Sequence, residues 1–413
     1  MKKWFLFTLL ICFIVNIYGQ NNGDTLKSPT NYSFIIQDSP AQLFTMRQVN
    51  ESYLSGYRLL SRGLYSALEN DYFADLIQLG IESIFLMPLT HEEGHRSILT
   101  VNNIGSVSQP YFNKHGAAYV KGVTDKTLQN LRDNNLPTYI RLHSGGLESD
   151  YMLSKRMEAI GSFEQDIFKH YKWEYWTRKM GILQYYVTGL FHYDMEIEEE
   201  DNELERDIVG YDTYGAARHL HRPDMDFYRY TKYKELTSEE KDYVRRMGYR
   251  SLLNLLNPLI IGKNNFNLTD NLKINAGMGY TIAPFGDFID ETIWLKYNDF
   301  NIELYFRQFQ NKQNWFPGFG LSLVDYSFSD HFMTTICGHY WQQPKKMNFY
   351  TSDVSTGGAI DTKFSYFFLN DKEGTLKGVS IDLGMIYKTK GFLPGELYMD
   401  EHFGLRLGTS VRL

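Results

Sequence analysis

The sequence contains too few cysteines for a fold held together by disulfides. It has two, Cys12 and Cys337, and Cys12 lies in an N-terminal segment that we expect to be removed. A single remaining cysteine can form no intramolecular disulfide. The fold must therefore be stabilised by its core, by a metal ion or by a membrane.

Excess positive charge and a long apolar run are also missing. The net charge is -7 and no basic stripe is present, so we expect no nucleic-acid partner. The most apolar stretch outside the N-terminal segment, Leu76 to Leu89, is short for a membrane-spanning helix and contains Gln78 and Glu82. A transmembrane anchor is therefore not evident in the mature chain.

The first nineteen residues have the features of a secretory signal peptide. Lys2 and Lys3 precede an apolar region from Trp4 to Val15, and Gly19 offers a small residue for cleavage. We expect the protein to be exported, with the mature chain starting at residue 20.

The most informative motif is His91-Glu92-Glu93-Gly94-His95. On an α-helix two histidines four residues apart share one face, so both imidazoles can bind one Zn²⁺ while Glu92 acts on an adjacent water. Pro88 suits the first turn of such a helix. The alternative is an ordinary charged helix, but a polar cluster inside an apolar segment is costly unless something binds it.

These residues resemble the HExxH motif of the zincin metallopeptidases, over a span from about Pro88 to Met157. In zincins of the gluzincin kind a glutamate on a second helix is the third ligand, and Glu148 matches it here. The match departs from the family at Met152, where an aspartate is usual. Asp150 is therefore an alternative ligand, or a hydrogen-bond partner for one imidazole. Glu148 is otherwise a helix N-terminal acid, placed after the Gly145-Gly146 turn.

The resemblance implies peptide hydrolysis by a zinc-activated water. Glu92 would take the proton of that water and deliver it to the leaving amine. His143 is a weak candidate for an oxyanion donor, and an ordinary loop histidine is the simpler interpretation. His219 and His221 form a further pair that can bind metal, although a loop is again the simpler interpretation. Residues 194–207 form an acidic loop that we expect to be solvated.

The hydrophobic pattern changes near residue 265. Residues 20–265 show helical periodicity, whereas residues 266–413 alternate apolar and polar positions in about eight strands. The predicted fold class is α+β, with a mainly helical zincin-like domain followed by an antiparallel β-barrel. Apolar positions on one face, charged positions on the other and 16% aromatic residues favour an outer-membrane barrel over a soluble sandwich.

Two functions are compatible with these features. The first is an exported zinc metallopeptidase attached to the outer membrane, acting on a peptide or protein substrate. The second is a non-enzymatic envelope scaffold with a structural metal or none. Because an even number of strands returns both barrel ends to one side, we expect the helical domain to lie in the periplasm.

Overall fold

The computed structural model describes residues 29–39, 44–109, 118–194, 199–371 and 373–413. The predicted signal peptide, residues 1–19, lies outside these ranges.

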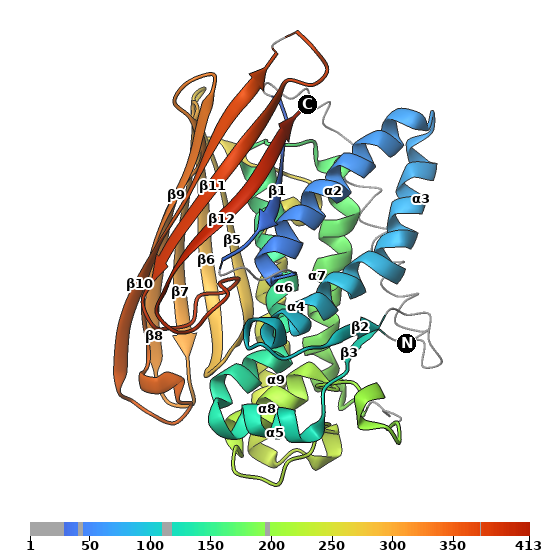
Figure 1. The fold of residues 1–413 in the computed structure, drawn as a ribbon, viewed down its shortest axis with the longest axis vertical. Helices are drawn as coiled ribbons and strands as arrows, with labels where there is room; N and C mark the ends of the chain where they lie inside the picture. The colour runs from blue at the N-terminus through green and yellow to red at the C-terminus, as the bar shows by residue number, and fades with distance from the viewer. Residues whose placement is uncertain (1–28, 40–43, 110–117, 195–198, 372) are drawn as a thin grey trace.

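The N-terminal half is mainly helical (Figure 1). Its α-helices are α2 (Met46–Ala67), α3 (Asp71–Ile81), α4 (Met87–Val101), α5 (Asp125–Asn134), α6 (Leu136–Ser162), α7 (Lys172–Val187), α8 (Asp212–His221) and α9 (Ser238–Ser251). A π-helical turn, η1 (Glu82–Leu86), joins α3 to α4, and β2 (Val107–Gln109) pairs with β3 (Tyr119–Lys121). Single 3₁₀ turns in this half are η2 (Phe168–His170), η3 (Thr188–Phe191), η4 (Glu203–Glu205), η5 (Tyr233–Glu235), η6 (Leu252–Leu255) and η7 (Pro258–Ile261). A further one, η8 (Lys345–Met347), lies in the C-terminal half.

The C-terminal half builds one large antiparallel sheet. Its strands are β4 (Phe266–Asn267), β5 (Leu272–Ala283), β6 (Gly286–Tyr297), β7 (Phe300–Gln310), β8 (Trp315–Ser327), β9 (Phe332–Pro344), β10 (Val354–Asn370), β11 (Gly378–Lys388) and β12 (His402–Arg412). The N-terminal strand β1 (Asn31–Gln37) pairs with β12, so the order is β1-β12-β11-β10-β9-β8-β7-β6-β5-β4.

This sheet corrects two expectations. Its described strands number ten rather than about eight, because β1 comes from the half that was predicted to be helical and β4 is a short strand of two residues. Its described strands also form an open sheet, since β1 and β4 are its edges and do not pair with each other. The expected sequence of helices followed by an antiparallel sheet is confirmed, whereas the described strands do not close into a barrel.

The two faces of the sheet differ in chemistry as the alternation predicts. Exposed apolar side chains cover the face turned away from the helices, among them Ile293, Phe306, Leu321, Ile360, Phe364, Leu383 and Leu405. The inner face carries ion pairs, including the buried pair of Asp290 with Arg307 at 2.6 Å and the partly buried pair of Asp361 with Arg406. Charge is thus on the inside and apolar surface on the outside.

Helical segments cover the two open sides of the sheet, at β1 and along the part of β5 that β4 leaves unpaired. At β1 the Ser33 N–H donates to Ser55 Oγ on α2 at 2.9 Å. At β5 the Asn254 side chain, from η6, pairs with both the N–H and the C=O of Tyr280 at 3.0 Å. Edge groups that would otherwise pair with another chain are therefore satisfied by the protein's own helical half.

The segments α3, η1 and α4 form one continuous helix from Asp71 to Val101. Pro88 lies inside this helix, where a proline lacks the N–H that donates to the preceding turn and its ring clashes with that turn. Near Pro88 the helix widens, because the Met87 N–H donates to Glu82 O five residues back. By length and composition this 31-residue helix could cross a membrane. The sequence indicated only the apolar part of this helix, and its full length comes from the structure.

Helices and sheet share a buried core. Leu147 of α6 and Tyr186 of α7 belong to the same buried cluster as Tyr280 and Ile282 of β5. The change of pattern near residue 265 therefore separates two kinds of secondary structure that pack on each other.

Candidate metal centre

The HEEGH motif lies where α4 crosses the middle of α6. A Cβ on Gly94 would lie 2.8 Å from Ser149 Cβ and 2.9 Å from Gly145 C, so only glycine allows this close approach. Gly145 and Gly146 are therefore not a turn at a helix start, as the sequence suggested. They are interior residues of α6 that let α4 pack against it.

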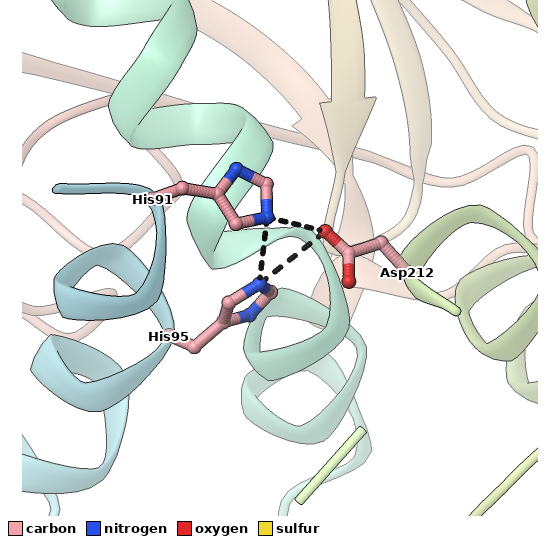
Figure 2. Close-up of side chains that lie close together, drawn as sticks. All are labelled: His91, His95 and Asp212. Carbon is pink, nitrogen blue, oxygen red and sulfur yellow. Dashed lines mark hydrogen bonds and ion pairs between the residues drawn. The ribbon is translucent and has the colours of Figure 1, made fainter. Parts of the chain in front are cut away.

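His91, His95 and Asp212 converge at this crossing (Figure 2). The Nε2 atoms of the two histidines are 3.3 Å apart, and Asp212 Oδ2 lies 3.2 Å from His91 Nε2 and 3.3 Å from His95 Nε2. All three side chains are almost completely buried. This group could hold a metal ion.

The hydrogen bonds of the two Nδ1 atoms determine which nitrogen of each imidazole faces the other ring and Asp212. His91 Nδ1 lies 2.7 Å from Asp150 Oδ2, and His95 Nδ1 lies 2.7 Å from Leu142 O. Since both partners are acceptors, the Nδ1 atoms carry protons and both Nε2 atoms face Asp212. Burial lowers the pKa of each ring, but Asp150 and Asp212 outweigh burial at His91 and raise its pKa well above the usual range, and Asp212 raises the pKa of His95 to about 8. A metal ion at this centre would therefore displace protons from the two Nε2 atoms, which would then offer lone pairs beside Asp212 Oδ2.

The separations fit a tetrahedral ion. Ligand atoms bonded at about 2.0–2.1 Å in tetrahedral geometry lie about 3.3 Å from one another. The three measured separations, 3.2 to 3.3 Å, match this value. Gly146 faces the same point: a Cβ there would lie 2.5 Å from His95 Nε2 and closer still to His91 Nε2. The missing side chain leaves the room that an ion needs.

Asp212 is ionised in this environment. Burial by itself raises the pKa of Asp212, but the adjacent His95 and His91 outweigh burial and hold the pKa of the carboxyl below its usual range. It is therefore available as an anionic ligand.

Glu92 lies beside the group without being part of it. Its side chain is largely buried, and no hydrogen bond or ion pair within the described ranges holds its carboxylate. A second acid, Asp207, lies near Glu92. Burial and the charge of Glu92 together raise the pKa of Asp207 to about 7. The carboxylate of Glu92 is thus left available for proton transfer.

Asp150 is a hydrogen-bond partner of the His91 imidazole, which is the second of the two roles predicted for it. Its Oδ2 accepts from His91 Nδ1, and its Oδ1 accepts from Arg178 at 2.6 Å. Arg178 is itself buried and also donates to Glu174 at 2.5 Å. This chain of contacts fixes the orientation of the His91 ring and ties α4 to α6 and α7.

The structure does not bring Glu148 to the two histidines. Its carboxylate accepts from Arg141 Nε at 2.9 Å, from Arg141 Nη2 at 2.8 Å and from the Gly395 N–H at 2.8 Å. It also lies in the middle of α6, since that helix starts at Leu136 and not near residue 148. The expectation of Glu148 as third ligand is therefore corrected, and Asp212 occupies that position.

His143 is not a loop residue either. It lies in α6, completely buried, and its ring stacks on His219 with centroids 5.3 Å apart. Burial lowers the pKa of His143 to about 3 and takes the pKa of His219 well below its usual range, so both rings are neutral. His219 and His221 lie in α8 rather than in a loop, and neither joins the group formed by His91 and His95.

The acidic segment is partly structured. Residues 195–198 lie outside the described ranges, but Glu203 accepts from the Asp125 N–H at 2.7 Å, and Glu205 pairs with Lys121 at 2.6 Å. Asp194, Glu199, Asp201 and Glu205 are nevertheless exposed, so the expectation of a solvated segment holds for these described residues.

Asp212 belongs to no sequence motif that would identify it as a metal ligand. It lies 117 residues after His95 (212 − 95) and comes together with the histidines only through the packing of α8 on α6. One signal was present: Asp212 is an isolated acid in an otherwise uncharged segment from Ile208 to Ala217. A buried acid in such a segment needs a partner.

A separate cavity of about 400 Å³ lies between the inner face of the sheet and helices α2 and α6. Its lining includes Arg47, Lys155, Asp290 and Arg307. The three residues of the candidate metal group do not line it.

Comparisons with known proteins add little to this geometry. No protein-family model and no curated protein matches the chain. A comparison with solved structures finds OccAB3 of Acinetobacter baumannii at a TM-score of 0.26 and 10% identity, covering 36% of this chain. The match covers 46% of that protein, which is less than half of its length. A likeness at this level carries no argument about fold or function.

Proposed function

We propose that the protein is a zinc-dependent hydrolase, with peptides as substrates, held in the outer membrane by its sheet. The observation that carries the proposal is the convergence of His91 Nε2, His95 Nε2 and Asp212 Oδ2 at 3.2 to 3.3 Å, facing the space beside Gly146. Two histidines and a carboxylate form a donor set typical of catalytic zinc, which keeps one position for water or substrate.

Each residue has a distinct task in this proposal. When bound, zinc supplies a Lewis acid that polarises a carbonyl group and makes water a better nucleophile. Asp150 and the Leu142 carbonyl hold the two imidazoles in the tautomer that directs Nε2 inward. Glu92 accepts a proton on its carboxylate and returns it to the leaving group. Burial of the group limits the access of bulk water.

The scaffold alternative differs from this proposal at Glu92. A structural metal needs four protein ligands and no general base. Within the described ranges the group offers three ligand atoms, and the neighbouring carboxylate of Glu92 has no partner. Both features favour a catalytic centre. Peptides are proposed as substrates because the HExxH motif resembles that of the zincins.

The faces of the sheet support a position in the membrane. A soluble sandwich turns its apolar face inward, whereas this sheet exposes that face and buries its charged one. Strands β7, β11 and β12 each have 11 residues, which is enough for a tilted strand to cross a bilayer.

The structure favours a different side of the membrane from the one first expected. Thr30 and Leu413 pair at one end of the sheet, while α5, α8 and α9 gather at the other (Figure 1). At that second end Tyr350 of the β9–β10 connection donates to His221 O at 2.6 Å. This end also has the longest connections, residues 345–353 and 389–401. Long connections are extracellular in outer-membrane proteins, so we place the end with α8 outside the cell.

The test of catalysis compares Glu92→Gln with Glu93→Gln in the zinc-loaded, detergent-purified protein. Glu93 is the adjacent acid on the same helix but is paired with Arg96, away from the metal group. Screened against a peptide library, Glu93→Gln should cleave like the parent. Glu92→Gln should keep its zinc and lose cleavage, because an amide accepts no proton. Equal cleavage by both variants at equal zinc content would remove Glu92 from the mechanism.

A further inference from the structure

The helix that carries the metal ligands has an unusual exposed face. From Tyr72 to Leu89 every exposed residue is apolar. We call this set the outer stripe: Tyr72, Phe73, Leu76, Ile77, Ile81, Ile84, Phe85 and Leu89, with exposures of 37 to 56%. The spacing follows the helical period, so these side chains lie on one side of α3 and η1.

The charged and amide side chains between Tyr72 and Leu89 are buried and paired. Asp75 binds Lys172, Gln78 accepts from Tyr57, and Glu82 accepts from Tyr53. Charged residues reach the surface only at the ends of the outer stripe. Asp71 lies next to Lys169 at one end, and Glu93 pairs with Arg96 at the other. The division between the two sides is therefore complete over this length.

The outer stripe has the length of a bilayer core. Seventeen steps of about 1.5 Å from Tyr72 to Leu89 give about 26 Å, against a hydrocarbon thickness of about 30 Å. A stripe of this length without a charged residue is far more apolar than the surface of a soluble helix.

The outer stripe also lies on the helical side of the molecule, between the two sides of the sheet that no strand closes. Helix α2 packs on β1, α3 packs on α2 and α7, and η6 packs on β5, so these helices fill the side between the two sheet edges. Leu60 of α2, Leu256 after η6 and Ile261 of η7 are also exposed on the helical half. Irregular backbone and free strand edges are not tolerated against lipid. A sheet placed in a bilayer therefore requires an apolar, internally hydrogen-bonded wall on its open side.

We propose that the outer stripe faces the hydrocarbon of the same bilayer that covers the sheet. Helices α2 and α3 with η1 then complete the perimeter that the strands leave open. The inference rests on the proposed position of the sheet in the outer membrane. It extends that proposal, because the helical half becomes part of the membrane-embedded body rather than a domain outside it. His91 follows the stripe by two residues, so the metal group lies at the border of the bilayer.

Lipid contact can be measured position by position in the full mature chain. Single cysteines are placed at Leu76 and Ile81 in the outer stripe, at Leu321 on the outer face of the sheet, and at Leu204 as control, in a Cys337→Ser background. Leu204 is a matched control because it is apolar and 41% exposed but lies on η4, near α5. Each cysteine is labelled with an environment-sensitive fluorophore, and the protein is reconstituted into phosphatidylcholine vesicles containing nitroxide-labelled lipid.

The inference predicts strong quenching at Leu76→Cys, Ile81→Cys and Leu321→Cys, with little at Leu204→Cys. Quenching at residue 321 without quenching at 76 and 81 would overturn the inference and leave the membrane position of the sheet intact. Absence of quenching at residue 321 would overturn the membrane position itself, and the inference with it. Two stripe positions are used so that one poorly folding variant does not decide the result.

Discussion

Gly146→Ala tests the metal group by filling the space in which the ion would lie. The added methyl carbon would lie 2.5 Å from His95 Nε2 and closer to His91 Nε2, which is near the bond length of about 2.0–2.1 Å that zinc makes to imidazole nitrogen. The methyl group and the ion therefore compete for one position. We expect zinc affinity to fall by more than about 100-fold, beyond the 10- to 100-fold typical of lost outer contacts.

The effect on folding should be much smaller than the effect on metal binding. Crowding one methyl group into a packed site costs roughly 1–3 kcal/mol, and replacing a helical glycine by alanine returns about 0.5–1 kcal/mol. Gly80→Ala is the matched control, because a Cβ at Gly80 has nothing within 4 Å. Zinc titration by calorimetry, with circular dichroism to check the fold, measures both effects. If folded Gly146→Ala bound zinc as tightly as Gly80→Ala, the proposed ion position would be refuted.

Four further predictions concern separate parts of the structure. Asp212→Asn should lose most of its zinc, measured by elemental analysis, whereas Asp224→Asn on an exposed loop should not; equal zinc content would exclude Asp212 as a ligand. Glu148→Gln should keep zinc but lower the free energy of unfolding by roughly 3–5 kcal/mol in denaturant titration, because it breaks a buried pair with Arg141; loss of zinc with an intact fold would restore Glu148 as a ligand. Asn254→Ala should cost roughly 2–6 kcal/mol by leaving two groups of Tyr280 unpaired, and an unchanged denaturation midpoint would contradict this. Zinc affinity should fall as the pH drops below about 8, because the neighbouring Asp212 outweighs burial and raises the pKa of His95 to about 8, and both Nε2 atoms must lose their protons to bind; a pH-independent affinity would argue against imidazole ligands.

The sequence predicted the parts of the site that local periodicity determines. His91 and His95 share a helical face because they are four residues apart, and alternation along the strands correctly divided apolar from charged positions. Asp150 was considered as a partner of an imidazole N–H, and the structure places it at His91 Nδ1.

Contacts between distant segments were beyond what such patterns determine. Glu148 was chosen by its distance along the chain after His95, yet its buried neighbour Arg141 neutralises it within the same helix. Asp212 reaches the histidines from α8, a helix with no recognisable motif. Strand β1 joins the sheet next to β12, at the far end of the chain, and therefore leaves no local trace of its partner.

The most direct test of the central claim is a crystal structure of the zinc-loaded protein with anomalous data collected on both sides of the zinc absorption edge. The account predicts one strong anomalous peak beside Gly146, about 2.0–2.1 Å from His91 Nε2, His95 Nε2 and Asp212 Oδ2. A peak bound by Glu148, or zinc bound elsewhere with the three atoms left free, would contradict it.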